Sequence, residues 1–113
     1  MYVVKTTRDF DSIIKNGKCI KNKYYVIHYK DNKLPYDRFG ISVSKKLGNA
    51  VFRNKYKRKM RSIIDNYKKE YLNNRDYIII LRKEAISKSF KELNQSFFDL
   101  MLTSERKVSD EKE

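Results

Sequence analysis

The densest chemical signal in this sequence is a run of positive charges. Between Lys45 and Arg61 (KKLGNAVFRNKYKRKMR) there are eight Lys or Arg residues and no Asp or Glu. Cations spaced this closely repel one another unless a polyanion or water screens them, so such a run is typical of a surface that faces nucleic acid. Within it Arg53, Lys57 and Arg61 recur every four residues, which stacks them along one side of a helix. The run therefore predicts a patterned, polyanion-binding surface.

Residues that could carry catalysis are few. His28 is the single histidine and Cys19 the single cysteine, which excludes a His-pair metal site, a thiol-based zinc site and an internal disulfide. A Cys–His nucleophile is the one arrangement left, and nothing in the sequence orients the pair. Asp9 and Asp11 have the D-x-D spacing of some metal-dependent nucleases, but residues two apart on a helix do not face each other. Carboxylates that balance the helix dipole explain them better, so we expect no catalytic residue.

Two further features could extend the binding surface. Gly48 precedes a helix whose first turns carry Arg53 and Lys57, and free N–H groups at a helix N-terminus bind anions, although a simple loop glycine explains it equally well. The nine Tyr and six Phe could stack on bases where they are exposed, but most must form the core of a domain without Trp. Phe10 and His28 are the best stacking candidates, because a short helix crossing a sheet leaves a groove at its edge. Taken alone, His28 is more often a structural strand residue.

The composition fits one small domain with an anionic partner. The chain has 113 residues, a formal net charge of +13 and an isoelectric point near 9.8, so it can build one modest core. No apolar run approaches the roughly 20 residues of a membrane span, and MYVVKTTRDF lacks the apolar core of a signal peptide. With its single cysteine, the chain is expected to be soluble and cytosolic.

Hydrophobic periodicity places these residues on a short series of elements. In chain order the pattern predicts a helix over 6–16, strands over 24–29 and 38–44, a helix over 49–71, a strand over 76–81 and a helix over 87–102. The first two strands are expected to pair as a hairpin through a long polar turn. The order predicts an α/β (α+β) sandwich in which a small sheet packs against one long basic helix, with a crossover that is normally right-handed. Residues 1–103 would form a single domain, and 104–113 a frayed, charged tail.

The stretch from Gly40 to Arg61, GISVSKKLGNAVFRNKYKRKMR, closely resembles the signature of the bacterial ribonuclease P protein subunit, K-x-G-x-A-V-x-R-N-x-x-K-R-x-x-R. Nine positions match at fixed spacing: Lys46, Gly48, Ala50, Val51, Arg53, Asn54, Lys57, Arg58 and Arg61. The resemblance extends over nearly the whole chain. It departs at Lys55, where the family's RNR triplet has a second arginine, and the change keeps the charge but loses the planar guanidinium. It also departs at Ile14, where a second aromatic residue is common and base stacking is therefore not supported.

What the resemblance implies is a ferredoxin-like, ribosomal protein S5 domain 2-like sandwich with the unusual left-handed crossover. The holoenzyme removes the 5′ leader from precursor tRNA, and its catalytic groups belong to a large RNA. The magnesium ions would also lie mainly on that RNA, with no organic cofactor, while any metal site of the protein itself is unknown. The protein would then be a cofactor subunit in the bacterial cytoplasm, bound one to one to the catalytic RNA and also contacting precursor tRNA.

The resemblance also implies roles for individual residues. The cleft for the single-stranded leader would be lined by Phe10, Ile14, His28, Ser42, Ala50, Lys57 and Arg61. The signature that faces the catalytic RNA would consist of Lys46, Gly48, Arg53, Asn54, Lys55 and Arg58. This division is physically sensible, because small residues let a nucleotide backbone approach and cations neutralise phosphates. Since the family usually presents an aromatic residue at the position of His28, a stacking role there becomes as plausible as a structural one.

Two alternatives of other classes stay open on the sequence alone. A ribosomal component would share the size and basicity, and it would prefer ribosomal RNA without any dependence on a leader. A protein-only nuclease would rest on Asp9, Asp11 and His28, and it would cleave RNA without an RNA subunit.

Overall fold

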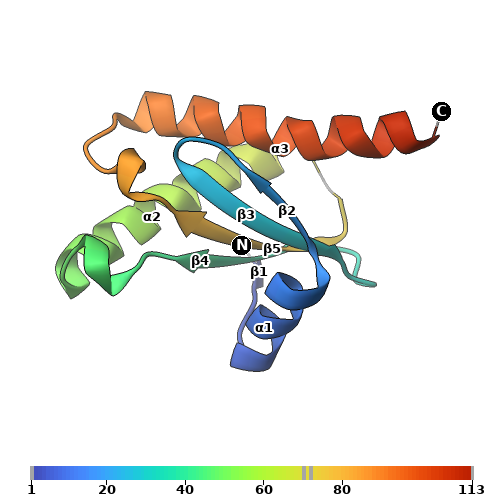
Figure 1. Cartoon of the computed structure of the whole chain (residues 1–113), viewed down its shortest axis with the longest axis horizontal. Helices are drawn as coiled ribbons and strands as arrows, with labels where there is room; N and C mark the ends of the chain where they lie inside the picture. Colours follow the sequence, from blue (N-terminus) through green and yellow to red (C-terminus); the bar gives the residue numbers. More distant parts are fainter. Residues whose placement is uncertain (1, 70, 72, 113) are drawn as a thin grey trace.

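A five-stranded mixed sheet forms the centre of the molecule, in the order β1-β4-β5-β3-β2 (Figure 1). Its strands are β1 (Tyr2–Val3), β2 (Lys18–Lys21), β3 (Tyr25–Asp31), β4 (Arg38–Ser42) and β5 (Arg75–Leu81). This computed structural model describes residues 2–69, 71 and 73–112, with side chains through Ser104. The α+β sandwich expected from the sequence is confirmed.

Three α-helices pack on the sheet, and each is preceded by a residue whose side chain caps its N-terminus. They are α1 (Thr7–Asn16), α2 (Ala50–Lys68) and α3 (Phe90–Lys112). The capping oxygens belong to Thr6, Asn49 and Ser89, which accept hydrogen bonds from the backbone N–H of Asp9, Phe52 and Glu92 at 3.1, 2.9 and 3.1 Å. Short 3-10 helices cover Lys45–Leu47 and Lys83–Ala85. Within the described residues, none of the helices is long and apolar enough to cross a membrane.

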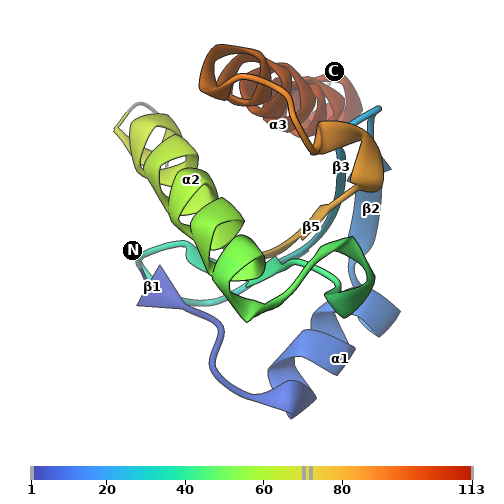
Figure 2. The same ribbon diagram turned by 90° about the vertical axis from the view of Figure 1, so that its left-hand side faces the viewer.

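The two faces of the sheet are covered differently, as Figure 2 shows: α2 and α3 lie on one side and α1 on the other. Successive residues of a strand point to opposite faces, so β5 contributes to both layers. Tyr77 and Ile79 belong to the large core shared with α2 and α3, whereas Ile78 packs with Val4 and Ile13 on the side of α1. The sheet is therefore the shared floor of a large core and a small one.

The predicted hairpin between residues 24–29 and 38–44 is wrong. Strand β5 lies between β3 and β4, and it pairs antiparallel with β3 and parallel with β4. The reason is burial, since six of the seven residues of β5 are buried and such a strand is most stable where both faces are covered. The edge strands β1 and β2 are absent from the sequence prediction, because β1 has two residues and β2 buries only Ile20.

The β4–α2–β5 connection is left-handed, contrary to the general rule and in agreement with the family expectation. In Figure 2 the C-terminal ends of β4 and β5 point toward the reader, as their leftward course in Figure 1 requires. From this side α2 lies above the sheet, and β5 lies to the right of β4 in the order that runs from β1 to β2. A right-handed crossover would place β5 on the left.

The C-terminal helix is longer than the predicted span of 87–102, because its backbone is helical from Phe90 to Lys112. The predicted tail over 104–113 falls mostly on residues whose side chains lie outside the described part of the chain. Its frayed character stays a prediction.

Candidate nucleic-acid interface

Helix α2 has the two-sided character that its sequence predicts. Tyr56, Met60 and Tyr67 are among the residues that it buries in the core. The opposite side presents the cations and polar residues of the signature, of which Asn54, Lys55, Arg58 and Arg61 are exposed while Arg53 and Lys57 are half-buried. Packing of the apolar side fixes the helix to the sheet, so the cations are held at defined positions.

Three adjoining hollows connect α2 with α1, and we call them together the α1–α2 groove. The central hollow, of about 220 Å³, is lined by Val3, Val4, Phe10, Phe39, Gly40, Ile41, Lys57 and Arg61. The second, of about 410 Å³, extends along α1 and is lined by Lys5, Thr6, Thr7, Phe10, Asp11 and Ile14. The third, of about 340 Å³, opens on α2 and is lined by Asn54, Lys57, Arg58 and Arg61. Phe10 is shared by the first two hollows, and Lys57 and Arg61 by the first and third.

Close approach of the Phe10 ring to the sheet shapes the central hollow. A Cβ atom at Gly40 would lie 2.5 Å from Cζ of Phe10 and 2.9 Å from Cδ1 of Ile78, so only glycine leaves room for the ring. A glycine inside a strand often marks such an approach. The sequence prediction gave Gly40 no role in the cleft, although its place within a strand was the signal.

Three other residues of the predicted cleft are not among the residues that line these hollows. In the β-ladders His28 is opposite Ile78, which in turn is opposite Gly40, so His28 lies on the sheet face that α1 partly covers. Ser42 is two residues beyond Gly40 on the same strand and shares that face. Ala50 is the exposed first residue of α2.

His28 and Cys19 are closer together than the sequence indicates. Cys19 lies on β2, and it is the register partner of His28 on β3. The His28 ring is half-buried, and its Nδ1 is covered without a hydrogen-bond partner in the described part of the chain. No third group orients the imidazole through that nitrogen, so the pair lacks the arrangement of an activated nucleophile. Across the same residues no group of three His, Cys, Asp or Glu side chains could hold a metal ion.

Asp9 and Asp11 do not form a pair. Asp9 Oδ2 lies 3.7 Å from Nη1 of Arg38, and Arg38 donates two hydrogen bonds to Asp76, at 2.8 and 2.6 Å. Asn32 Nδ2 donates a third to Asp76, at 2.8 Å. Burial raises the pKa of Asp76, whereas the hydrogen bonds from Arg38 and Asn32 lower it. The lowering effects together are larger, so the pKa of Asp76 is below its ordinary value. This network fastens α1 to the sheet, whereas Asp11 is exposed and lines the second hollow.

Lys46 and Gly48 precede α2 and Arg53 lies in its first turn, and these three signature residues differ in their surroundings. Lys46 is exposed in the 3-10 helix over Lys45–Leu47. Gly48 lies against the Phe52 ring, because a Cβ atom there would approach Cδ1 of Phe52 to 2.4 Å. Close packing therefore accounts for this glycine. The guanidinium of Arg53 has its Nε covered and without a hydrogen-bond partner among the described residues.

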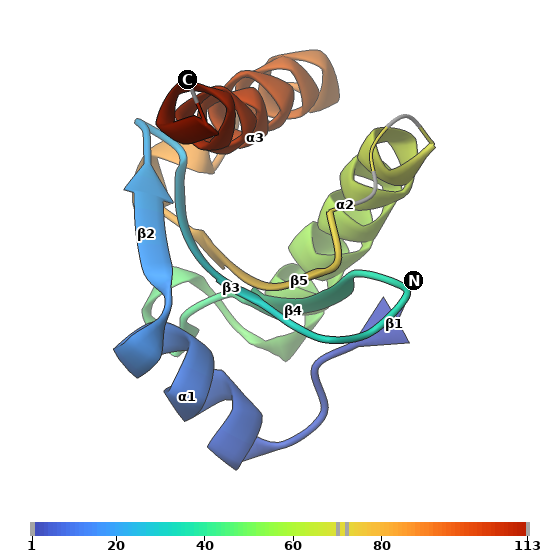
Figure 3. The same ribbon diagram turned by 90° about the vertical axis from the view of Figure 1, so that its right-hand side faces the viewer.

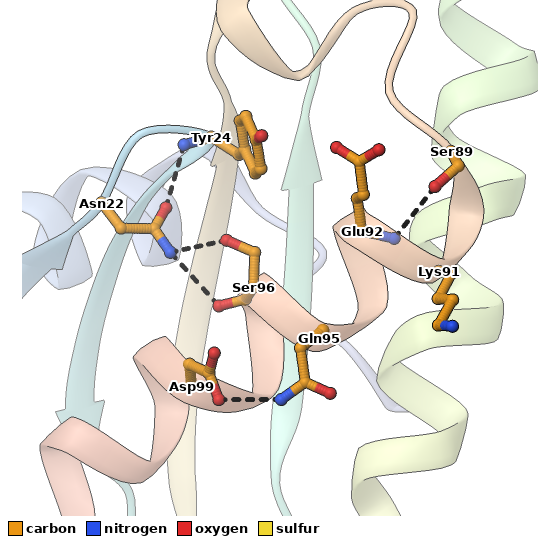
Figure 4. Close-up of a pocket in the computed structure, with 8 residues that line it drawn as sticks. All are labelled: Asn22, Tyr24, Ser89, Lys91, Glu92, Gln95, Ser96 and Asp99. Carbon is orange, nitrogen blue, oxygen red and sulfur yellow. Dashed lines mark hydrogen bonds between the residues drawn. The ribbon is translucent and has the colours of Figure 1, made fainter.

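The largest hollow described lies elsewhere, between α3 and the turn that joins β2 to β3 (Figure 4). It measures about 630 Å³ and is lined by Asn22, Tyr24, Ser89, Lys91, Glu92, Gln95, Ser96 and Asp99. Its side chains bond to one another: Asn22 Nδ2 donates to Oγ of Ser96 at 2.8 Å, and Gln95 Nε2 donates to Oδ1 of Asp99 at 3.0 Å. With two carboxylates and one lysine, it does not suit a polyanion.

Comparison with known proteins agrees with the signature. A family model described as Ribonuclease P matches residues 1–105. The ribonuclease P protein component of Mycoplasma mycoides is 41% identical over 100 residues, which cover 88% of this chain and 92% of the relative. That of Streptococcus pneumoniae is 37% identical over 101 residues, covering 89% of this chain and 82% of the relative.

Solved structures agree in fold as well as in sequence. The RNase P protein of Staphylococcus aureus superposes with a TM-score of 0.84 at 36% identity, over 92% of this chain and 95% of the other. That of Thermotoga maritima superposes with a TM-score of 0.81 at 32% identity, over 88% and 94%. This chain therefore belongs to the ribonuclease P protein family and is a protein component of that tRNA-processing endonuclease.

Proposed function

We propose that this chain holds the single-stranded 5′ leader of precursor tRNA in the α1–α2 groove, while the outward side of α2 contacts the catalytic RNA. The observation that carries the proposal is the central hollow. There the ring of Phe10 and the cations of Lys57 and Arg61, which come from separate helices, meet over a strand that has no side chain at Gly40. A stacking ring beside phosphate-neutralising cations is the usual combination for single-stranded nucleic acid.

The proposed path of the leader extends from the central hollow in both directions. Ile14 offers an apolar contact in the second hollow, next to Phe10. On the sheet face, His28 and Ser42 continue the surface beyond Gly40, and exposed Ala50 leaves room for a nucleotide backbone at the start of α2. Few of these side chains can read base edges, so we expect the leader to be bound with limited sequence preference.

Catalytic RNA is proposed to bind the outward side of α2 and the turn before it. The residues on that side are Lys46, Gly48, Arg53, Asn54, Lys55 and Arg58. Their cations would contact phosphates and fix the position of the protein rather than read sequence. Because Lys57 and Arg61 line both the central hollow and the third one, they lie where leader and catalytic RNA would come together.

The chemistry itself is assigned to the RNA subunit. Magnesium ions would be bound mainly by RNA phosphates, and this chain would assist by neutralising charge and positioning the leader. We propose one copy of the protein for each RNA subunit, in the bacterial cytoplasm. The family matches do not favour the alternative of a ribosomal component.

Reconstitution tests the proposal directly. Adding the purified chain to its cognate ribonuclease P RNA at low magnesium concentration should accelerate cleavage of precursor tRNA, and the complex should bind precursor tRNA more tightly than leaderless tRNA. The protein without RNA should leave the substrate intact, which also tests the protein-only nuclease. Equal affinities for the two tRNAs would contradict the proposal that the groove binds the leader. An absence of acceleration would contradict the proposal that the chain assists cleavage.

A further inference from the structure

A pair of stacked aromatic rings lies beside the groove at the β1 edge of the sheet. The ring centroids of Tyr2, on β1, and Tyr36, two residues before β4, are 3.9 Å apart with 24° between the ring planes. Tyr2 is 55% exposed, and Tyr36 is half-buried. Rings of this size normally contribute most by burial, so a stacked pair left this open gains little from the core. More than half of the Tyr2 surface is therefore accessible to a ligand.

A lysine lies next to this pair, where its charge can neutralise a phosphate of a bound ligand. Lys68 Nζ lies 5.9 Å from the centroid of the Tyr2 ring. Lys68 is also eleven residues after Lys57 and seven after Arg61, which at 3.6 residues per turn puts all three on one side of α2. Lys57 and Lys68 are therefore about 16 Å apart along this side of α2, with Arg61 and the exposed Asp65 between them.

The pair is continuous with the groove through its own strand. Val3, the residue after Tyr2, lines the central hollow together with Lys57 and Arg61. Strand β1 stands at the end of the sheet order and pairs only with β4, so its other edge is not covered by a strand within the described residues. A chain that leaves the central hollow along β1 meets the Tyr2 ring next.

We propose that Tyr2 and Tyr36 form a stacking platform for a base of the single-stranded leader after it leaves the α1–α2 groove, and that Lys68 neutralises the adjoining phosphate. This inference rests on the proposed function. Exposed aromatic rings beside cations hold single strands with little regard to sequence, because every base has a stacking face. The platform adds a dependence on leader length.

The position of the platform also indicates which leader nucleotides it would bind. Most of the signature that would face the catalytic RNA lies between Lys46 and Arg58, at the start of α2 or just before it. Lys68, in contrast, is the last residue of α2. Because the catalytic groups are assigned to the RNA subunit, the scissile bond is expected to lie next to that RNA. The platform therefore takes nucleotides toward the 5′ end of the leader, farther from the bond that is cut.

The experiment is a binding series with the reconstituted holoenzyme and precursor tRNAs whose leaders lengthen one nucleotide at a time. For the unmodified protein, affinity should rise when the leader fills the groove and again when it reaches the platform. Tyr2→Ala should abolish only the second rise, about five- to a hundredfold in affinity. Tyr2→Phe, which keeps the ring, should restore it, whereas Tyr2→Leu, which keeps apolar bulk for folding, should not.

Two controls separate this inference from the proposed function. Phe90→Ala removes a 42% exposed ring at the start of α3 and should leave both rises intact. Lys57→Ala should weaken the first rise. If Tyr2→Ala and Tyr2→Leu leave the second rise in place while Lys57→Ala weakens the first, the platform is overturned and the groove stands. An equal loss with Tyr2→Ala at every leader length would show a structural role, which also overturns it.

Discussion

Helices α2 and α3 pack against the same face of the sheet, yet only one of them is suited to RNA. Both bury an apolar side: α3 contributes Leu93, Phe97, Leu100 and Met101 to the core that α2 enters with Tyr56, Met60 and Ile63. Their outer sides differ, because α2 has no acid before Asp65 whereas α3 carries Lys91, Glu92 and Asp99 in its first three turns. Both helices share one core, so the charge of the outer side is what distinguishes α2 as the proposed RNA-binding helix.

The hollows next to the two helices teach the same lesson. The hollow at α3 is larger than any of the three that make up the α1–α2 groove. Its polar groups bond to one another, and it offers a polyanion two carboxylates. The smaller central hollow has a ring, two cations and a bare glycine. The groove that we propose as the functional surface is therefore distinguished by its side chains rather than by its volume.

The largest expected effect tests whether α3 is purely structural. Phe97 is fully buried, with ring centroids of Tyr25 and Tyr67 at 5.7 and 5.8 Å. Phe97→Ala should lower the free energy of unfolding by about 3–5 kcal/mol, because it leaves a cavity between α3, α2 and the sheet. Urea titration measures this. Leader affinity of the folded fraction should not change, and a loss of affinity there would mean that α3 takes part in binding.

The next effect concerns the contact between α1 and the sheet. Gly40→Ala should displace the Phe10 ring, costing about 1–3 kcal/mol of stability and weakening binding of precursor tRNA but not of leaderless tRNA. A double-mutant cycle checks the cause. Most of the stability cost should disappear in a Phe10→Ala background, and a cost that persists undiminished would place the clash elsewhere.

Removal of a single positive charge should then weaken binding when the charge lies on α2 but not when it lies on α3. Lys57→Ala or Arg61→Ala should each weaken substrate binding by about 1–2 kcal/mol and reduce the slope of log affinity against log salt by about one. The matched control is Lys91→Ala on α3, which removes an exposed lysine beside Glu92 and should change neither quantity. Similar losses for Lys91 and Lys57 would erase the distinction between the two helices.

The smallest effect concerns the network that anchors α1, and it is expected to disappear in acid. Because the folded-state pKa of Asp76 is below its ordinary value of 3.8, its contribution to stability is fully present above that pH and is lost as the pH falls through the folded pKa. Asp76→Asn should therefore destabilise the protein at neutral pH, and the difference should shrink below pH 3.8. Thermal unfolding across pH measures it, with the exposed Asp99→Asn as control. A difference that stays constant with pH would exclude the charge of Asp76 as its source.

Much of the fold could be predicted because its signals are local. Capping by Thr6, the periodicity of α2 and the apolar run of β5 each identify an element from residues that are close together in the sequence. Strand pairing is not local. The hairpin prediction failed because no pattern within β3 or β4 indicates that β5 will lie between them. Arg75 of β5 contacts Asp31 of β3, and these two residues are 44 positions apart in the sequence.

The same division holds for the groove. The spacing of Lys57 and Arg61 indicated a common side of α2, and the structure brings both to Phe10 at one hollow. The place of Gly40 under the Phe10 ring and the pairing of Asp9 with Arg38 depend on how α1 crosses the sheet, which no local pattern specifies.

The central position of β5 has a consequence for how the chain is made. Both β3 and β4 hydrogen-bond to β5, so neither has its main partner until the ribosome has synthesised Leu81. By then all of α2 exists, with its polycationic side complete and its apolar side lacking the finished sheet. The nascent chain thus carries a basic amphipathic helix before it has a core, and because its strand contacts are distant in sequence, folding should be slow compared with that of a helical bundle of this size.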